Sequence, residues 1–190
     1  MTAFRSCIMG AFCVLAAAAA TISGPVDVDT ALTPVSGTSS PGSGTFTSVF
    51  NPTTDILTFT LMWTGLTADV TNAHIHLAST VGGNGGVLIP FFSPGSVETI
   101  APAPPTLPLG TSGTLTEAIH ITDGTTLSKF EDGLIAGTLY VNVHTTNFPG
   151  GEIRGNLPQV IVPEPITFAL VGAGLLGLGT VARRRRRALA

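Results

Sequence analysis

Charged residues are scarce in this chain, and basic ones are almost absent from its middle. Charged side chains make up 10% of the 190 residues, and between residues 21 and 162 only Lys129 and Arg154 are basic, against ten acids. This central part therefore carries a net charge near −8, although the whole chain has a formal charge of −3. A nucleic-acid-binding protein needs Lys and Arg side chains spread over a folded face to neutralise phosphates. We therefore expect no nucleic acid among the partners.

Cysteine is also scarce, because Cys7 and Cys13 are the only two and both lie in an apolar run that follows Arg5 and ends at Ala20. A short basic region, an apolar stretch of about 7–15 residues and small residues at the cleavage site are typical of a secretory signal peptide. We predict a signal peptide over residues 1–23, handled by the export machinery and removed by signal peptidase. The mature chain would then have no thiol, which excludes disulfides, cysteine nucleophiles and cysteine metal ligands.

The C-terminal region contains a second long apolar run. It covers residues 166–182 and is followed by a basic cluster, Arg183, Arg184, Arg185, Arg186 and Arg187. A helix of this length spans roughly 25 Å at about 1.5 Å per residue, which is close to the thickness of a bilayer core. We predict one transmembrane helix over 166–182. The arginines would hold its far end in the cytoplasm and leave the acidic body outside.

The residues Val162, Pro163, Glu164 and Pro165 stand just before this run. With the Gly- and Leu-rich stretch and the terminal arginines, they resemble the PEP-CTERM sorting tail of Gram-negative bacteria, over residues 161–190. The resemblance implies cleavage near the Pro-Glu-Pro by an exosortase-type enzyme, with the precursor only transiently in the inner membrane. It also implies delivery of the mature form to the cell surface or extracellular matrix, with exopolysaccharide as a further partner. A plain tail anchor is the alternative.

The body of the chain, residues 24–160, has the pattern of an all-β domain. Apolar residues recur there with period two, which is typical of half-buried strands. We expect strands over 44–50, 56–63, 72–78, 86–91, 113–122, 137–145 and 151–157. One short helix is expected over 126–135, with Thr126 as its N-cap and Gly137 just beyond its end. The proline-rich segment 90–108 cannot run as a central strand. The prediction is a single antiparallel β-sandwich or barrel of about seven strands.

Polar side chains share one face on three of these expected strands. They are Asn72, His74 and His76 on one strand, Tyr140, Asn142 and His144 on another, and Glu152, Arg154 and Asn156 on a third. Two histidines separated by one strand residue have Cα atoms about 6.6 Å apart, so their rings can converge on one ion. His144 would complete a three-nitrogen site for zinc or copper. That metal site is the alternative. The interpretation we favour is a structural polar layer with no cofactor, in which Asn142 takes part and Glu152 pairs with Arg154.

Three segments of the body carry a second resemblance. They are Ala73-His-Ile-His76, Leu139-Tyr-Val-Asn-Val-His-Thr145 and Asn147-Phe-Pro-Gly-Gly-Glu-Ile-Arg-Gly-Asn156. These segments resemble the CHRD domain, over roughly residues 30–158, with Asn156 where that pattern has Gln. The resemblance implies an immunoglobulin-like or superoxide-dismutase-like β-sandwich of extracellular proteins, and it implies no known catalytic activity.

Motifs for other chemistry are missing from the sequence. There is no Gly-x-Ser-x-Gly elbow, no phosphate-binding loop and no His-Glu-x-x-His. We therefore expect an exported, non-enzymatic protein of the cell surface or extracellular matrix. Two alternatives stay open. One is a zinc- or copper-binding β-sandwich that uses the His-x-His strand, which would allow metal-dependent redox activity. The other is a carbohydrate-binding module of the matrix.

Overall fold

The computed structural model describes residues 20–92 and 97–162. Within them the chain forms β1 (Val26–Asp27), β2 (Thr30–Pro34), β3 (Ser43–Asn51), β4 (Ile56–Thr64), β5 (Val70–Ala78), β6 (Gly85–Pro90), β7 (Glu98–Ala101), β8 (Gly113–His120), α1 (Gly124–Ala136), β9 (Leu139–Thr145) and β10 (Ile153–Asn156). Most of the predicted signal peptide and all of the predicted helix 166–182 lie outside the described residues. No helix in the described part of the chain is long and apolar enough to cross a membrane.

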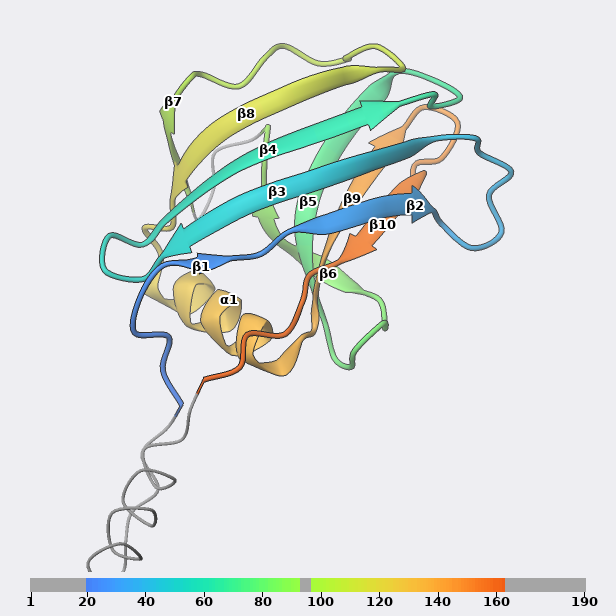
Figure 1. The fold of residues 1–190 in the computed structure, drawn as a ribbon. Coiled ribbons are helices and arrows are strands. Elements are labelled where there is room, and N and C mark those ends of the chain that lie inside the picture. Colours follow the sequence, from blue (N-terminus) through green and yellow to red (C-terminus); the bar gives the residue numbers. More distant parts are fainter. Residues whose placement is uncertain (1–19, 93–96, 163–190) are drawn as a thin grey trace, which may run out of the picture. The chain divides into compact units, whose positions relative to one another are not determined.

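The strands pair into one antiparallel sheet that curls into a half-barrel (Figure 1). Along the sheet the order is β6-β5-β9-β10-β2-β3-β4-β8-β7, and β1 pairs with β3 off this path. Two residue pairs, Ile153 with Pro34 and Arg154 with Thr33, join β10 to β2 and connect the two halves of the sheet. We call this short junction the seam. The sheet curls around it, so that the two halves enclose a common interior.

The all-β prediction with one short helix is confirmed, but the expected number of about seven strands is too low. The extra strands are β1, β2 and β7, which contain only two, five and four residues. Such short pieces have too few alternating positions to be recognised by period two. The β7 strand lies inside the proline-rich segment and pairs only with β8 at one edge of the sheet, which is where prolines are tolerated. The immunoglobulin-like or superoxide-dismutase-like subtype stays a prediction.

The hairpin of β3 and β4 shows how the alternating sequence builds the sheet. Its register runs without interruption from Ser43 opposite Thr64 to Asn51 opposite Ile56. The turn contains Asp55, whose φ of 56° lies in the left-handed region that Asp tolerates better than most residues. Inward-facing side chains, which are mostly apolar, then alternate with outward-facing ones along both strands. The exceptions to the apolar-in, polar-out pattern are the buried Ser48 and the exposed Val49 and Met62.

Three phenylalanines connect the two halves of the sheet across the interior. The rings of Phe46 and Phe59, from β3 and β4, both lie near that of Phe91, which directly follows β6. Phe46 stacks on Phe91 with planes 3° apart, whereas Phe59 is tilted by 31° with its ring centroid 4.4 Å from that of Phe91, and all three side chains are fully buried. Aromatic contacts at such distances add to the effect of burying apolar area. The described domain therefore has one continuous hydrophobic core.

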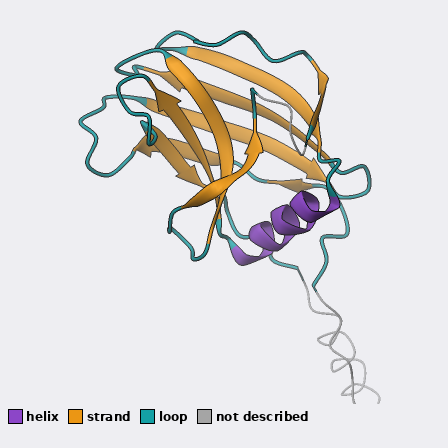
Figure 2. Cartoon of the chain, turned by 180° about the vertical axis from the view of Figure 1, so that it is seen from behind, coloured by secondary structure: helices purple, strands orange, loops and turns teal. Residues whose placement is uncertain are grey.

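The helix α1 closes one end of the half-barrel (Figure 2). Its Phe130 meets Phe50 of β3 edge-on, with ring centroids 5.0 Å apart. Asp123 is the N-cap, since its extended backbone precedes the first turn and its carboxylate accepts from the Thr126 amide at 2.7 Å. The prediction that Thr126 caps the helix is therefore wrong, because the helix begins two residues earlier than expected. Gly137 ends the helix in the left-handed conformation, with φ 68°, as expected.

Candidate metal centre

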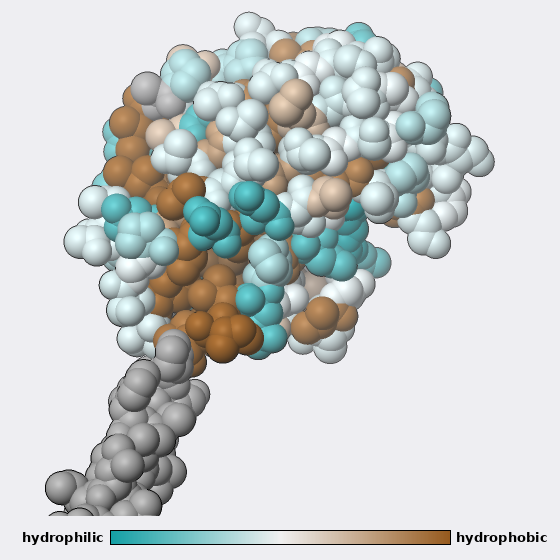
Figure 3. Space-filling view, viewed as in Figure 1, coloured by the Kyte–Doolittle hydropathy of each residue, from teal (hydrophilic) through white to brown (hydrophobic). Residues whose placement is uncertain are grey.

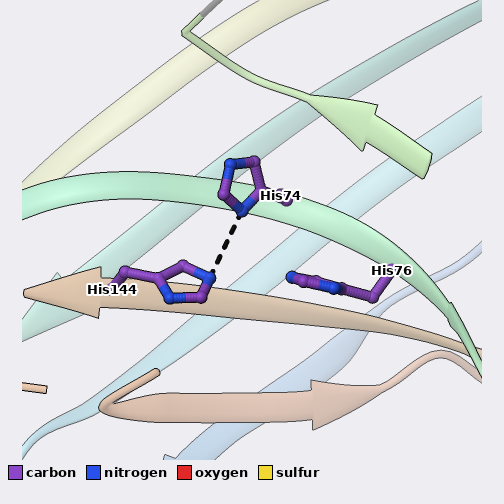
Figure 4. A group of neighbouring side chains, drawn as sticks. All are labelled: His74, His76 and His144. Atoms are coloured by element: carbon purple, nitrogen blue, oxygen red, sulfur yellow. Dashed lines mark hydrogen bonds between the residues drawn. The ribbon is translucent and has the colours of Figure 1, made fainter. Parts of the chain in front are cut away.

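The structure brings His74, His76 and His144 together on the outer face of two neighbouring strands (Figure 4). His74 and His76 lie two residues apart on β5, and His144 lies on β9, which pairs directly with β5. The ring centroids are 5.4 Å apart for His74 and His76, 5.0 Å for His74 and His144, and 5.8 Å for His76 and His144. The three rings thus surround one small space.

Nitrogen atoms of the three rings are close to the spacing that one metal ion requires. One ring nitrogen from each residue lies within 4.8 Å of the others. The closest pair is His74 Nδ1 and His144 Nε2, at 3.3 Å. Two nitrogen ligands on a tetrahedral zinc ion lie about 3.3–3.4 Å apart, given bond lengths of about 2.0–2.1 Å. One pair therefore already has this spacing, and a ring shift of roughly 1–1.5 Å would bring in the third.

Backbone carbonyls fix the tautomers of two of these rings. His76 donates from Nδ1 to the Gly85 carbonyl at 3.1 Å, and His144 donates from Nδ1 to the Pro149 carbonyl at 2.8 Å. A carbonyl oxygen can only accept, so in both neutral rings Nδ1 carries the hydrogen and Nε2 carries the lone pair. His76 Nε2 is buried and has no hydrogen-bond partner. Histidines that ligate metals are oriented in the same way, because the ring nitrogen that does not bind the ion donates its hydrogen to a carbonyl or carboxylate.

The electrostatics of the cluster favours neutral rings. Burial, and then the proximity of His144 and His76, lowers the pKa of His74 to about 4. Burial also lowers the pKa values of His76 and His144, although each ring's hydrogen bond to a carbonyl acts in the opposite direction. Neutral imidazole is the form that binds a metal ion. At neutral pH the ring nitrogens are therefore available as ligands.

A stack of side chains holds His76 in place from one side. The ring of His76 lies parallel to that of Tyr140, with centroids 4.8 Å apart and an angle of 7° between planes. The guanidinium carbon of Arg154 lies 3.4 Å from the centroid of the Tyr140 ring. The Tyr140 hydroxyl also exchanges hydrogen bonds with the backbone of Gly85. The sequence pattern gives Tyr140 no role of its own, although its place two residues before Asn142 puts it on the same polar face.

Glu152 and Arg154, which the polar-layer alternative paired, have separate partners. The Glu152 carboxylate accepts from Ser40, from Thr145 and from both the amide and the hydroxyl of Thr67. Burial alone would raise its pKa, but these donors together hold the pKa below its ordinary value. The Arg154 guanidinium donates instead to Asn84 and Asn156 and to the Gly83 carbonyl. The described contacts of these two residues therefore include no ion pair between them.

Asn142 lies beside the cluster, directly opposite His74 on the neighbouring strand. Its amide nitrogen donates to the Gly150 carbonyl at 3.2 Å, while its buried oxygen has no partner. Gly151 covers this side chain with a φ of 114°, and a Cβ there would lie only 2.2 Å from the Asn142 oxygen. The loop after β9 can therefore close over Asn142 only with glycine at position 151.

Comparisons with known proteins agree with both resemblances seen in the sequence. A family model described as the CHRD domain matches residues 19–157, and one described as the PEP-CTERM protein-sorting motif matches residues 162–187. No curated protein and no solved structure matches the chain. Since the first match covers most of the 190 residues, the chain belongs to the CHRD domain family, and it carries a PEP-CTERM sorting motif at its C-terminal end.

Proposed function

We propose that this protein is exported and sorted to the cell surface or extracellular matrix of a Gram-negative bacterium, where it acts without catalysing a reaction. The match of residues 162–187 to the sorting motif carries this proposal. The apolar run 166–182 and the following arginines would anchor the precursor in the inner membrane until an exosortase-type enzyme cuts near Pro163.

Mass spectrometry of the surface fraction tests this sorting. The expected product lacks residues 1–23 and ends near Val162. Replacing Pro163, Glu164 and Pro165 by alanine should keep the uncut precursor in the membrane, while replacing the distant Pro52 should not. A surface form that retains Arg183 to Arg187 would contradict exosortase processing.

For the molecular role of the domain, we propose that His74, His76 and His144 bind one zinc or copper ion. The unpartnered Nε2 of His76 is the observation that favours this role over a purely structural polar layer. A buried acceptor without a partner costs about 1–3 kcal/mol, and a bound ion would remove that cost. The tautomers fixed by Gly85 and Pro149 place the lone pairs of two rings where ligands are needed.

Binding requires one rearrangement of a proton. Because Nε2 of His144 carries a lone pair, the hydrogen between it and His74 belongs to His74 Nδ1. For His74 to ligate through Nδ1, that hydrogen must pass to its own Nε2, which leaves the ring neutral. Three nitrogen donors then leave a fourth coordination position for a non-protein ligand.

The fourth histidine of the chain provides a matched control for a metal-binding test. His120 lies on β8, in the other half of the sheet from β5 and β9. The protein is stripped with chelator, incubated with zinc or copper, desalted and submitted to elemental analysis. We expect one ion per chain in the wild type and in His120→Ala, and loss of the ion in His74→Ala, His76→Ala and His144→Ala. Metal content that these three substitutions leave unchanged would exclude the site.

A further inference from the structure

Two segments at one end of the domain contain no charged residue, although the domain as a whole is strongly acidic. The segment that follows β10, residues 157–162, contains no charged residue, and neither does the last turn of α1, residues 133–136. Ile161 is 79% exposed, while Ile135, Val160 and Val162 are partly buried against the core. These four side chains form what we call the apolar base. Figure 3 shows apolar surface gathered at this end, around α1 and the point where the described chain stops.

Hydrogen bonds hold the segment 157–162 against α1, so the apolar base is a built part of the fold. The Val160 amide donates to the Leu134 carbonyl at 2.9 Å, and the Gln159 side chain donates to the Ile135 carbonyl at 2.7 Å. The Gln159 side chain also lies against Gly137, which ends the helix. Ile161 therefore projects from a fixed backbone.

The sequence beyond the domain indicates what this surface meets. Only Pro163, Glu164 and Pro165 separate Val162 from the apolar run 166–182. Three residues reach at most roughly 10 Å when extended. If that run is inserted in a membrane, the apolar base cannot move farther than this from the lipid interface. The rest of the domain, with ten acids and two bases, has no comparable attraction to lipid.

We propose that the apolar base rests on the lipid surface while the precursor is anchored, with Ile161 inserted among the headgroups, and leaves it once the tail is cut. This inference rests on the proposed sorting function. Full burial of one Ile side chain favours the buried state by about tenfold to a hundredfold. That is too little to bind a free domain to vesicles, but it is enough when a short tether supplies a high local concentration.

Spin labels at two positions test the proposal in residues 24–190, which lack the predicted signal peptide and both cysteines, reconstituted in phosphatidylcholine vesicles. One variant carries the label at Ile161→Cys. The matched control carries it at Met62→Cys, which is 50% exposed on the outer face of β4. Accessibility is measured to oxygen, which concentrates in lipid, and to chromium oxalate, which stays in water. We expect the ratio of the two accessibilities to be at least threefold higher at position 161 than at position 62.

The outcomes separate this inference from the anchoring on which it rests. If the protein floats with the vesicles but both labels report water, the apolar base does not touch lipid, although the tail is anchored. A label at 161 that is shielded from both reagents would mean that the tail or a second copy covers the base, which also overturns the proposal. If the chain does not float at all, the anchor itself fails. Residues 24–162 alone should not float, and flotation of that form would contradict release on cleavage.

Discussion

Replacing Glu117 should change how the unfolding free energy of this domain depends on pH. It lies on β8 between the inward-facing Leu115 and Ile119, opposite Phe59 of β4, and its side chain is only 1% exposed. Neither carboxyl oxygen has a hydrogen-bond partner. Burial raises the pKa of Glu117 from 4.5 to about 7. The carboxyl group is therefore accommodated best when it is protonated.

The size and sign of the effect follow from this pKa. A rise of the pKa from 4.5 to about 7 corresponds to a loss of stability of up to about 3 kcal/mol once the group must ionise. Below pH 4.5 the carboxyl group is protonated in both the folded and the unfolded chain, so it causes no loss of stability. Between pH 4.5 and 7 the unfolded chain ionises first, and stability falls. Above pH 7 the loss is complete.

Glu117→Gln removes this titration, so we expect the variant to gain stability relative to wild type as the pH rises. The difference in unfolding free energy should be near zero at pH 4.5 and reach about 1–3 kcal/mol at pH 8. Urea unfolding of residues 21–162, which form one compact unit, measures it at each pH. The matched control is Glu98→Gln, an exposed position on the neighbouring strand β7. A difference between Glu117→Gln and wild type that stays constant from pH 4.5 to 8 would refute the reasoning.

The site and its surroundings give three further predictions. Glu152→Ala leaves the donors of Thr67, Ser40 and Thr145 without an acceptor. Urea unfolding should therefore show an unfolding free energy that is lower by about 2–4 kcal/mol, whereas a loss below about 0.5 kcal/mol would mean that water replaces the carboxylate. Gly151→Ala combines a φ of 114° with a clash against Asn142 and should cost about 2 kcal/mol or more, whereas Gly150→Ala, with open space around it, should cost less. Zinc at 100 times its Kd should stabilise the wild type by about 2.7 kcal/mol in a thermal melt and leave the triple His→Ala variant unchanged; equal stabilisation of both would place the ion elsewhere.

Most of the strands predicted from the sequence have a long alternation, whereas the predicted segment 151–157 forms a strand only over Ile153–Asn156. In β4, for example, Leu57, Phe59, Leu61 and Trp63 all face the core, as period two requires. The apolar spacing predicts the helix but not its first residues, because Asp123 and Gly124 carry no apolar signal. The curl of the sheet could not be derived, since it depends on the seam between β2 and β10, which lie more than 100 residues apart in sequence.

The three histidines of the candidate metal site are predictable from the sequence, but the groups that orient their rings are not. Period two placed His74 beside His76, and His144 was available from a second strand with the same pattern. The carbonyls of Gly85 and Pro149 could not be foreseen, because backbone groups leave no residue-type signal in the sequence. Glu117 did have such a signal, since it occupies an inward position of an alternating strand, between Leu115 and Ile119. A charge at an apolar position of a regular pattern predicts a buried titratable group.

The seam also determines when the domain can finish folding. It joins β2, near the start of the domain, to β10, the last strand, so neither partner can complete the sheet until nearly the whole domain has been released. In an exported chain that crosses the membrane from its N-terminus, β10 emerges only just before the sorting motif at residue 162. Until β10 is available, the half of the sheet that contains β3, β4 and β8 therefore has an unpaired edge at β2. If the chain is exported as we propose, closing that edge is the last step in completing the sheet, and it coincides with the arrival of the sorting motif.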